Sequence, residues 1–463
     1  MYQPLTQLIL QPKHFYIQTF GCQMNEYDSA RVQHMLIGQG YRLTTEIEDA
    51  DVIFINTCAV REKAEQKVYS FLGRLRRLKV RKPGIKLLLA GCMAQQQGDK
   101  LLKRFDHLDL VLGTRSLAAL PNLVEKIQES GLRMAHLAED KDSADTYHDD
   151  CLTVVRGVAA PLTIMQGCDN YCSYCIVPYV RGSESSRPSW AILRELNDMV
   201  AAGIGEVTLL GQNVNSYGRK SSPELSFPEL LRKIQAETAV KRVRFTTSHP
   251  KDLTEELMQC FADLQCLCRN LHLPVQAGSD RILKLMNRGY TTAHYLDKIE
   301  RLRKLCPEMA LSTDVMVGFP GETDQDFQDT MKLLEQVQFD TLFSFRYSDR
   351  PPARATRFPD KVTEKDKARR LLELQAFQAE ITLGRNRKEI GCLREILVEG
   401  PSKTGGTQWM GRTQQNRIVN FESSVDLTGQ LVPVRIVAAY SHSLRGELMD
   451  GCVESSLCSP NAR

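Results

Sequence analysis

Strand-type and helix-type patterns alternate along most of this 463-residue chain, and that alternation restricts the fold to the α/β class. In the first part, apolar runs read as strands at 15–20, 52–56 and 86–90, with helical spacing at 25–39 and 61–78 between them. Strands joined by helices pair in parallel, because a parallel crossover needs a connection of that length. We therefore expect a small parallel α/β domain over residues 13–130.

The alternation repeats on a larger scale between residues 157 and 383. Six strand candidates lie at 162–166, 206–212, 242–247, 270–275, 310–318 and 340–347. Helical stretches such as 190–203 and 291–306 separate them. Six βα units predict a partial (βα)6 barrel of the TIM type over residues 154–384, with its chemistry at the C-terminal ends of the strands.

The last part of the chain changes character after a helical connector at 364–388. Short β-type runs broken by glycine, at 395–398, 417–421 and 431–438, predict a small antiparallel β-barrel over residues 385–449. Residues 384–449 hold nine Lys or Arg and six Asp or Glu, which suits an RNA-binding domain, although a purely structural domain fits as well. The polar, acidic stretch 138–150 reads as a linker.

The composition bounds the class of protein. Hydrophobic residues make up 42% and charged residues 25%, as in packed globular proteins, and the net charge of +4 permits a polyanionic partner without requiring one. No apolar run is long enough to cross a bilayer, and we read no signal peptide, so we expect a cytoplasmic protein. In that reducing compartment the 14 cysteines are metal ligands, reactive thiols or buried apolar residues rather than disulfides.

Three cysteines follow the first predicted barrel strand in a C-x3-C-x2-C pattern, namely Cys168, Cys172 and Cys175; we call them the loop trio. A given spacing of three cysteines arises by chance in about one chain of this size in a hundred. Three thiolates this close can bind three corners of a 4Fe–4S cubane and leave one iron open. A tetrahedral zinc site is the main alternative, but it needs a fourth ligand, and no His or Cys follows closely.

Three further cysteines, Cys22, Cys58 and Cys92, each follow one of the N-terminal strands; we call them the sheet trio. The carboxyl ends of parallel strands share one edge of a sheet, so these thiols can converge although they are far apart in sequence. The small residues Gly21 and Gly91 let the turns approach a bulky group. The alternative is three ordinary buried cysteines, which the repeated strand–small residue–Cys pattern disfavours.

The loop trio resembles the radical S-adenosylmethionine (SAM) superfamily, and both trios together resemble its methylthiotransferase family, whose C-terminal part is a TRAM domain. The resemblance covers about 13–449. Residues 21–29 (GCQMNEYDS), 56–64 (NTCAVREKA), 173–179 (SYCIVPY) and 411–421 (GRTQQNRIVNF) are similar to the branch that acts on isopentenyladenosine in tRNA. The Gly-Cys-Pro-Lys-Asn typical of the ribosomal-protein branch is absent at the first cysteine.

This resemblance implies an enzyme that uses SAM and two 4Fe–4S clusters, one on each trio. The implied reaction is methylthiolation of C2 of N6-isopentenyladenosine next to the tRNA anticodon. It implies a radical, formed from SAM at the loop trio, and a sulfur supplied at the sheet trio. Two alternatives stay open: a sister enzyme acting on threonylcarbamoyladenosine or a ribosomal protein, and a non-enzymatic RNA-binding metalloprotein.

Polar residues at the predicted strand ends are candidates for cofactor binding. The candidates are Gln212, Asn213, Ser248, Gln276 and Asp314. Residues 211–215 and 248–250 also fit polar turns without a ligand. Asp314 lies inside a strand, where a carboxylate needs a partner, so substrate contact and a structural ion pair are equally open. We expect Glu322, in the loop after that strand, to be structural.

Basic residues outside the cysteine loops are weaker candidates. Arg181 and Arg187 follow the loop trio and would contact SAM or RNA phosphate, or lie in a solvated loop. The basic run from Arg74 to Lys86 indicates either a solvent-exposed helix face or an RNA contact. The remaining eight cysteines read as structural. As further partners we expect the tRNA anticodon stem-loop, an electron donor such as flavodoxin or ferredoxin, and a sulfur or cluster donor, with the protein a monomer.

Overall fold

The computed structural model describes residues 12–59, 62–137, 157–220, 224–403 and 405–449. The linker expected at 138–150 lies outside these residues, as do Cys151, Cys452 and Cys458. The chain forms two compact units. The N-terminal unit comprises residues 1–154 together with Tyr179–Gly182, and the C-terminal unit comprises Val155–Pro178 and Ser183–Arg463. No helix among the described residues is long and apolar enough to cross a membrane.

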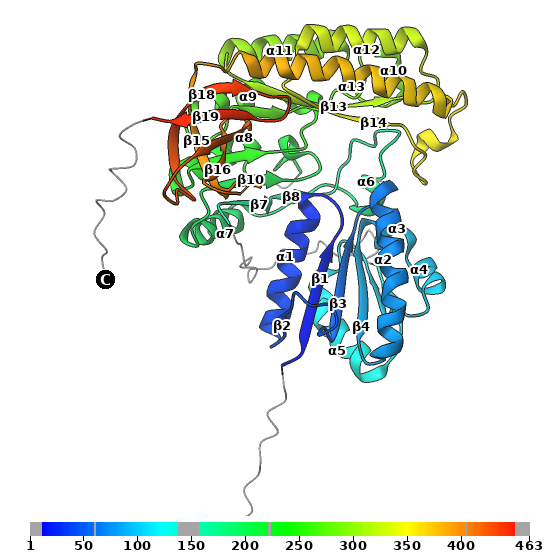
Figure 1. Ribbon diagram of the computed structural model, residues 1–463. Helices are drawn as coiled ribbons and strands as arrows, with labels where there is room; N and C mark the ends of the chain where they lie inside the picture. The colour runs from blue at the N-terminus through cyan, green and yellow to red at the C-terminus, as the bar shows by residue number, and fades with distance from the viewer. Residues whose placement is uncertain (1–11, 60–61, 138–156, 221–223, 404, 450–463) are drawn as a thin grey trace, which may run out of the picture. The chain divides into compact units, whose positions relative to one another are not determined.

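The N-terminal unit is built on a six-stranded, entirely parallel sheet in the order β2-β1-β3-β4-β5-β6 (Figure 1). The strands are β1 (His14–Thr19), β2 (Arg42–Leu43), β3 (Val52–Thr57), β4 (Lys86–Gly91), β5 (Leu110–Leu112) and β6 (Met134–His136). The helices are α1 (Gln23–Gly38), α2 (Glu62–Arg81), α3 (Cys92–Gln97), α4 (Asp99–Arg104) and α5 (Leu120–Ser130). The strand order reverses beside β1, which makes the β1/β3 edge the expected ligand crevice of an open α/β sheet.

Helices cover both faces of this sheet, which explains why its central strands are apolar throughout. Alternate residues of β3 and β4, such as Ile53 and Leu87, pack with α2 and α4 in one core. Their neighbours, such as Phe54 and Leu88, pack with α1 and α5 in a second core on the other face. A strand buried on both sides loses the polar alternation of a half-exposed strand, as the runs VIFI and LLLA show.

The C-terminal unit contains the six expected barrel strands: β7 (Ala159–Thr163), β10 (Glu206–Leu210), β11 (Arg242–Phe245), β12 (Asn270–His272), β13 (Ala310–Val317) and β14 (Thr341–Arg346). They form two parallel three-stranded sheets, β7-β10-β11 and β12-β13-β14. A parallel bridge between Val243 and Leu267 links β11 to the segment before β12. The prediction of a partial barrel is confirmed; β7 lies three residues earlier than expected, and the other five strands are shorter than the sequence indicated.

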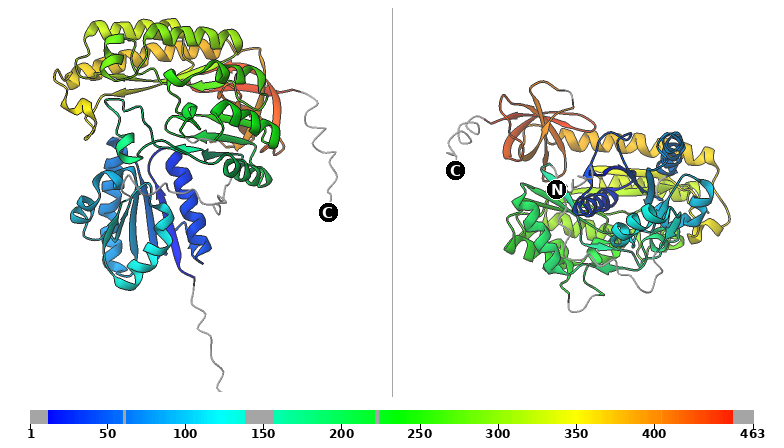
Figure 2. Two further views of the ribbon diagram at one scale, coloured as in Figure 1. Left: turned by 180° about the vertical axis from the view of Figure 1, so that it is seen from behind. Right: turned by 90° about the horizontal axis from the view of Figure 1, so that it is seen from below.

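Helices connect these strands. They are α6 (Val177–Val180), α7 (Ser189–Ala201), α8 (Phe227–Glu237), α9 (Glu255–Asp263), α10 (Asp280–Leu285), α11 (Thr292–Leu305), α12 (Asp324–Val337) and α13 (Glu364–Arg387). Short 3-10 turns lie at Leu117–Ala119, Val214–Ser216, Pro250–Asp252 and Arg354–Arg357, and β8 (Met165–Gln166) pairs with β9 (Ser185–Ser186). Helices α11, α12 and α13 lie side by side on the outside of the β12-β13-β14 half (Figure 2).

The last five strands close into a small barrel in the order β15-β16-β17-β19-β18 (Figure 2). They are β15 (Leu393–Pro401), β16 (Gln408–Thr413), β17 (Ile418–Glu422), β18 (Leu431–Ala439) and β19 (Leu444–Leu448). Alternating side chains such as Ile396, Val398, Val419 and Phe421 fill its interior. The sequence predicted three of these strands and the barrel form.

Two buried arginines of β11 attach this barrel to the rest of the C-terminal unit. Arg242 donates hydrogen bonds to the carbonyl oxygens of Arg412 and Glu395. Arg244 donates to the carbonyl oxygens of Gln414 and Thr413 and forms a buried ion pair with Glu206 at 2.7 Å. The strand period places both arginines on one face of β11. Ion pairs of Arg417 with Asp340 and of Arg394 with Glu308 add further attachments of the small barrel.

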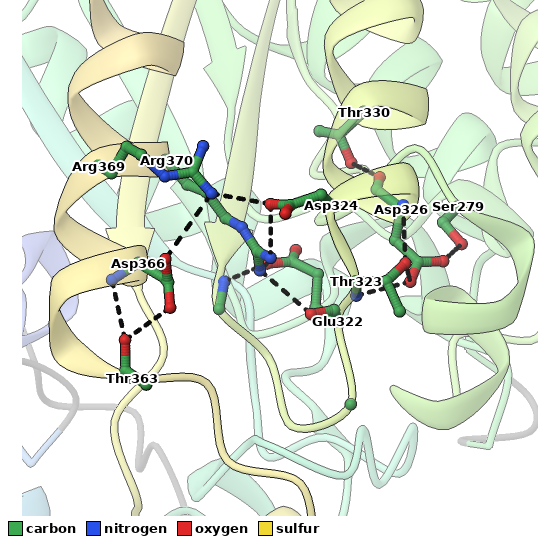
Figure 3. A network of polar contacts seen from close by, with 12 residues as sticks. Ser279, Glu322, Thr323, Asp324, Asp326, Thr330, Thr363, Asp366, Arg369 and Arg370 are labelled. Carbon is green, nitrogen blue, oxygen red and sulfur yellow. Dashed lines mark hydrogen bonds and ion pairs between the residues drawn. The ribbon is translucent and has the colours of Figure 1, made fainter.

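A polar network joins the loop after β13 to α12 and α13 (Figure 3). Arg370 of α13 pairs with the buried carboxylate of Glu322 at 2.7 Å, and the Gly318 amide donates to the same oxygen. Thr323 and Asp326 form a capping box that starts α12. The expectation that Glu322 is structural agrees with these contacts.

This network predicts a pH-dependent stability. Burial raises the pKa of Glu322 to about 7, against the opposing hydrogen bonds from Gly318 and Arg370. The folded protein therefore holds a proton that the unfolded chain releases near pH 4.5, so stability falls as the pH rises between those two values. Relative to Glu322→Gln, the wild type should lose about 2 kcal/mol of unfolding free energy between pH 5.5 and 7.5, measured by urea unfolding.

A matched control is Glu364→Gln on α13. Glu364 is exposed, and a hydrogen bond from Lys367 lowers its pKa, so its titration lies below this pH window. The difference in unfolding free energy between Glu364→Gln and the wild type should stay constant between pH 5.5 and 7.5. Parallel stability curves for the wild type and Glu322→Gln would contradict the prediction.

Candidate functional sites

The sheet trio lies at the carboxyl ends of three neighbouring strands. Cys22 follows β1, Cys58 directly follows β3, and Cys92 directly follows β4. In the sheet register Thr57 stands opposite Gly91, so Cys58 and Cys92 leave adjacent strands at the same level. Cys58 and Cys92 are buried and Cys22 is exposed. The three strands therefore end at one edge of the sheet, as predicted.

A buried amide network holds these strand ends. The Asn25 side chain donates to the Asn56 side chain at 3.0 Å and to the Thr57 carbonyl at 2.9 Å. Asn56 returns a hydrogen bond to the Asn25 carbonyl and another to Ser29, which accepts from Thr19. Both asparagines belong to the motifs that contain Cys22 and Cys58, so the motif residues fix the cysteine loops to each other.

Gly91 makes the close approach of β3 and β4 possible at this point. Its φ of +96° is in the region that favours glycine, and a Cβ would collide with the carbonyl oxygen of Thr57. The next residue is Cys92, which begins α3. A larger residue at Gly91 would therefore move Cys92 away from the end of β3.

Arg181 places a positive charge among the thiols of the sheet trio. Its Nε lies 3.4 Å from Cys92 Sγ. Burial raises the pKa of Cys92, the Arg181 cation opposes this, and the nearby Cys22 thiol adds to the rise. Arg181 is buried, so it is not in the solvated loop that the sequence left open as an alternative.

In the loop trio, Cys168 and Cys172 are buried and Cys175 is partly buried. The Cys175 amide donates to the Cys172 carbonyl, and Asn170 donates to Cys168 Sγ at 3.4 Å. Burial, with the neighbouring Cys172 thiol, raises the pKa of Cys168 to about 11. Burial, with both other thiols of the trio, raises the pKa of Cys175 to about 12. Three thiolates at this spacing need a cation to balance them, and iron binding meets that need while releasing the protons.

Arg288 is a functional candidate that the sequence did not indicate. Its buried guanidinium lies 3.4 Å from Cys172 Sγ and from the Tyr174 hydroxyl, and it donates to the Pro274 carbonyl at 2.7 Å. Arg288 follows Cys172 by more than a hundred residues, so no local pattern could connect them. The Ser173 side chain and the Asn287 side chain tie the cysteine loop to the same segment.

The predicted cofactor residues Gln212, Asn213 and Ser248 lie at the ends of β10 and β11. Gln212 accepts a hydrogen bond from the Gly167 amide at 2.6 Å, next to Cys168. Asn213 donates to Asp252, while its Oδ1 and the Ser248 hydroxyl are buried without a hydrogen-bond partner among the described residues. Buried polar atoms of this kind mark sites that a ligand can satisfy.

Gln276 follows β12, Asp314 lies inside β13, and the two residues are joined through the backbone. The Gln276 amide donates to the Asp314 carbonyl, and Gln276 has a φ of +75°. The Asp314 carboxylate lies 3.6 Å from His272 Nε2 and is partly exposed. His272 is thus a structural partner of Asp314, but the carboxylate is still accessible to a ligand. Both interpretations of Asp314, a substrate contact and a structural ion pair, are compatible with this geometry.

His249, next to Ser248, is buried. Burial, with the positive charges of Arg288, Lys251 and Lys298, lowers the pKa of His249 to about 2, so the ring is neutral at physiological pH. The Lys251 amide donates to its Nδ1, which leaves the hydrogen on Nε2, and Nε2 has no partner among the described residues. From the sequence, residues 248–250 fitted either a ligand-binding role or a plain polar turn.

The other basic candidates are only partly available for RNA. Arg187 is buried and pairs with Glu195 at 2.7 Å, so it does not lie in a solvated loop. Within the run on α2, Lys79 pairs with Asp109, whereas Arg74, Arg77 and Arg81 are exposed. Five cysteines outside the two trios are described: Cys260, Cys266, Cys268 and Cys306 are buried, and Cys392 is partly exposed.

Both trios offer suitable chemistry for an iron–sulfur cubane. Each supplies three thiols, and each has a buried arginine beside one sulfur. Among the described residues no three His, Cys, Asp or Glu converge on one metal ion, but a cubane binds each thiolate through a different iron and needs no such convergence. The donor sets therefore fit the cluster type that the sequence indicated.

A parallel half-barrel with a cysteine trio after its first strand defines the radical-SAM class. Residues 162–334 match the Radical SAM superfamily, residues 387–449 match the TRAM domain, and residues 14–113 match the family described as "Uncharacterized protein family UPF0004". The solved radical S-adenosylmethionine methyltransferase TsrM from Kitasatospora setae, with cobalamin and a 4Fe–4S cluster bound, has a TM-score of 0.55 at 13% identity. The match covers 75% of this chain and 77% of that chain, and it shows a shared fold.

Curated relatives match over nearly the whole length. The tRNA-2-methylthio-N(6)-dimethylallyladenosine synthase of Syntrophobacter fumaroxidans is 61% identical, covering 97% of this chain and 98% of the relative. The enzyme of the same name from Syntrophus aciditrophicus is 48% identical and covers 95% of each. The chain belongs to this family of radical-SAM tRNA methylthiotransferases. It is therefore an enzyme that uses SAM and iron–sulfur chemistry, and the non-enzymatic alternative is wrong.

The geometry of the sheet trio predicts the effect of Gly91→Ala. Gly91 has φ +96° and ψ −166°, a backbone conformation in which a residue with a Cβ is strained by about 1–3 kcal/mol, and the added Cβ also collides with Thr57. We expect unfolding free energy to fall by at least about 2 kcal/mol in urea unfolding. Gly38→Ala, at the end of α1, is the matched control, because its Cβ meets no atom within 4 Å. Equal stability of the two variants would contradict the assigned strand approach.

Proposed function

We propose that this enzyme methylthiolates C2 of N6-isopentenyladenosine next to the tRNA anticodon and gives 2-methylthio-N6-isopentenyladenosine, using two 4Fe–4S clusters. The observation that carries the proposal is the pair of cysteine trios, the sheet trio after three parallel strands and the loop trio in one loop after the first barrel strand, each with a buried arginine beside one sulfur. The names of the relatives support the choice of the nucleoside. tRNA is the macromolecular substrate.

The chain's own residues divide the work between three regions. We assign residues 13–130 to the auxiliary cluster, 154–384 to the radical-SAM core and 385–449 to RNA binding. When bound, SAM and the cluster of the loop trio supply the radical that removes hydrogen from adenine C2, and the auxiliary cluster supplies the sulfur. Three thiols in each trio leave one iron open for a further ligand.

The residues at the barrel strand ends orient the ligands. Asn213 and Ser248 present unpaired buried oxygens, and we assign them, with Gln212, Gln276 and Asp314, to SAM or base binding. The base must leave its stack to reach them, as in other enzymes that act on nucleobases. In the TRAM barrel, the exposed Lys403, Arg435 and Arg445 are available for RNA phosphate.

The other partners follow from the chemistry. Reductive cleavage of SAM needs a low-potential electron donor of the flavodoxin or ferredoxin class, and repeated turnover needs a sulfur or cluster donor. We expect a monomer that contacts the anticodon stem-loop. A second family substrate, threonylcarbamoyladenosine or a ribosomal protein side chain, is the outcome that the assay below must distinguish.

The proposal predicts opposite effects for two cysteine variants reconstituted anaerobically with labelled SAM and isopentenylated tRNA. Cys172→Ala should abolish 5′-deoxyadenosine formation and product. Cys58→Ala should keep 5′-deoxyadenosine formation and lose the methylthio product, because the sulfur centre alone is removed. Chromatography of the nucleosides with mass spectrometry measures both.

The control for this experiment is Cys306→Ala, a buried cysteine outside both trios, which should retain both products. Product formation by Cys58→Ala would contradict the two-cluster proposal. Methylthiolation of threonylcarbamoyl-containing tRNA, without reaction of isopentenylated tRNA, would reassign the substrate.

A further inference from the structure

The segment that follows the loop trio belongs by its contacts to the N-terminal unit. Tyr179–Gly182 is part of that unit, although Pro178 and Ser183 on either side are not. The Thr114 hydroxyl donates to the Val180 carbonyl, and Arg115 Nε donates to the Arg181 carbonyl at 3.0 Å. The backbone at Arg181 is thus attached to the residues that follow β5.

The Arg181 side chain is held by Asp28. Its Nη2 donates to Asp28 Oδ2 at 2.9 Å, and both side chains are less than 5% exposed. Asp28 is on α1, in the motif that contains Cys22. A buried ion pair offsets the cost of removing its two charges from water only when its geometry is good. The Asp28 carboxylate therefore holds the Arg181 guanidinium in one orientation.

One N–H donor of the Arg181 guanidinium is directed at a sulfur of the sheet trio. Another has no acceptor among the described residues. Nε lies 3.4 Å from Cys92 Sγ. Nη1 is buried and has no hydrogen-bond partner among the described residues. An unsatisfied buried charged donor is costly, and it points to an acceptor that the protein side chains do not provide.

We propose that Arg181 is a positioning residue of the auxiliary cluster: it donates N–H···S hydrogen bonds to the cluster's sulfur ligands and raises the cluster's reduction potential. This inference rests on the proposed function, because it requires that the sheet trio binds a cluster. The reduced cluster carries one more negative charge than the oxidised cluster, so a fixed cation stabilises the reduced form. Hydrogen bonds to cluster sulfurs act in the same direction.

Asp28 has the opposite electrostatic effect. It partly neutralises Arg181 while it orients the side chain. Removing the carboxylate alone leaves the cation beside the cluster, whereas removing both charges eliminates the hydrogen bonds and the nearer charge. The two changes should therefore shift the potential in opposite directions, which a purely structural role for the pair would not produce.

The test uses the full chain with Cys168, Cys172 and Cys175 replaced by Ala, so that bound iron reports on the sheet trio alone. A redox titration followed by electron paramagnetic resonance gives the midpoint potential after anaerobic reconstitution. Asp28→Asn should make the potential more positive, and Arg181→Gln combined with Asp28→Asn should make it more negative. Arg76→Gln, from an exposed ion pair of the same unit, should leave it unchanged.

The outcomes separate this inference from the proposed function. Bound iron whose potential is unmoved in the double variant, or moved in the same direction by both variants, would overturn the role of Arg181 and leave the proposed function standing. Failure of the starting protein to bind iron would overturn the proposed function itself. If the double variant cannot be loaded with iron, the sign of the Asp28→Asn shift decides: a positive shift supports the role and any other result overturns it.

Discussion

The hydrogen-bond register between β1, β3 and β4 is the constraint on which the rest of the N-terminal unit depends. It sets Thr19 opposite Asn56 and Thr57 opposite Gly91, so the residues that follow leave the sheet together. A shift of one residue would turn alternate side chains to the other face and separate the thiols. The two covered faces of the sheet make that register strongly preferred, because both cores must fill at once.

Charge balance is the common feature of the two cysteine sites. Burial raises the pKa of Cys92 in the sheet trio and of Cys168 and Cys175 in the loop trio, so these thiolates are disfavoured until a metal binds. Each also has a buried arginine close to one sulfur, Arg181 beside Cys92 and Arg288 beside Cys172. These arginines come from distant parts of the sequence, and each is itself fixed by contacts that do not involve sulfur. The fold thus places a cation beside each trio, as the proposed anionic clusters would need.

Much of the architecture could be predicted because the strands that carry the sites are long or apolar. β3 and β4 have continuous apolar runs, β13 is eight residues long, and glycines or cysteines at or directly after these strands mark their ends. The strands β2, β5 and β6 have only two or three residues each, too few for a periodic signal. β16, with the sequence QWMGRT, lacks an apolar run and was missed for that reason.

The environment of individual side chains was less predictable. The sequence placed Arg187 either on a ligand or in a solvated loop, but it pairs with Glu195 in the core. His272, the partner of Asp314, and the pairing of Arg181 with Asp28 depend on contacts between distant segments. Motif spacing identified which residues form a site, whereas the charges that surround them required the fold.

The most direct test of the account is the position of iron in the folded chain. Crystals of the anaerobically reconstituted protein, measured at the iron absorption edge, should give two separate anomalous peaks, one within bonding distance of Cys22, Cys58 and Cys92 and the other of Cys168, Cys172 and Cys175. A single peak, or sheet-trio sulfurs that point away from any iron, would contradict the account.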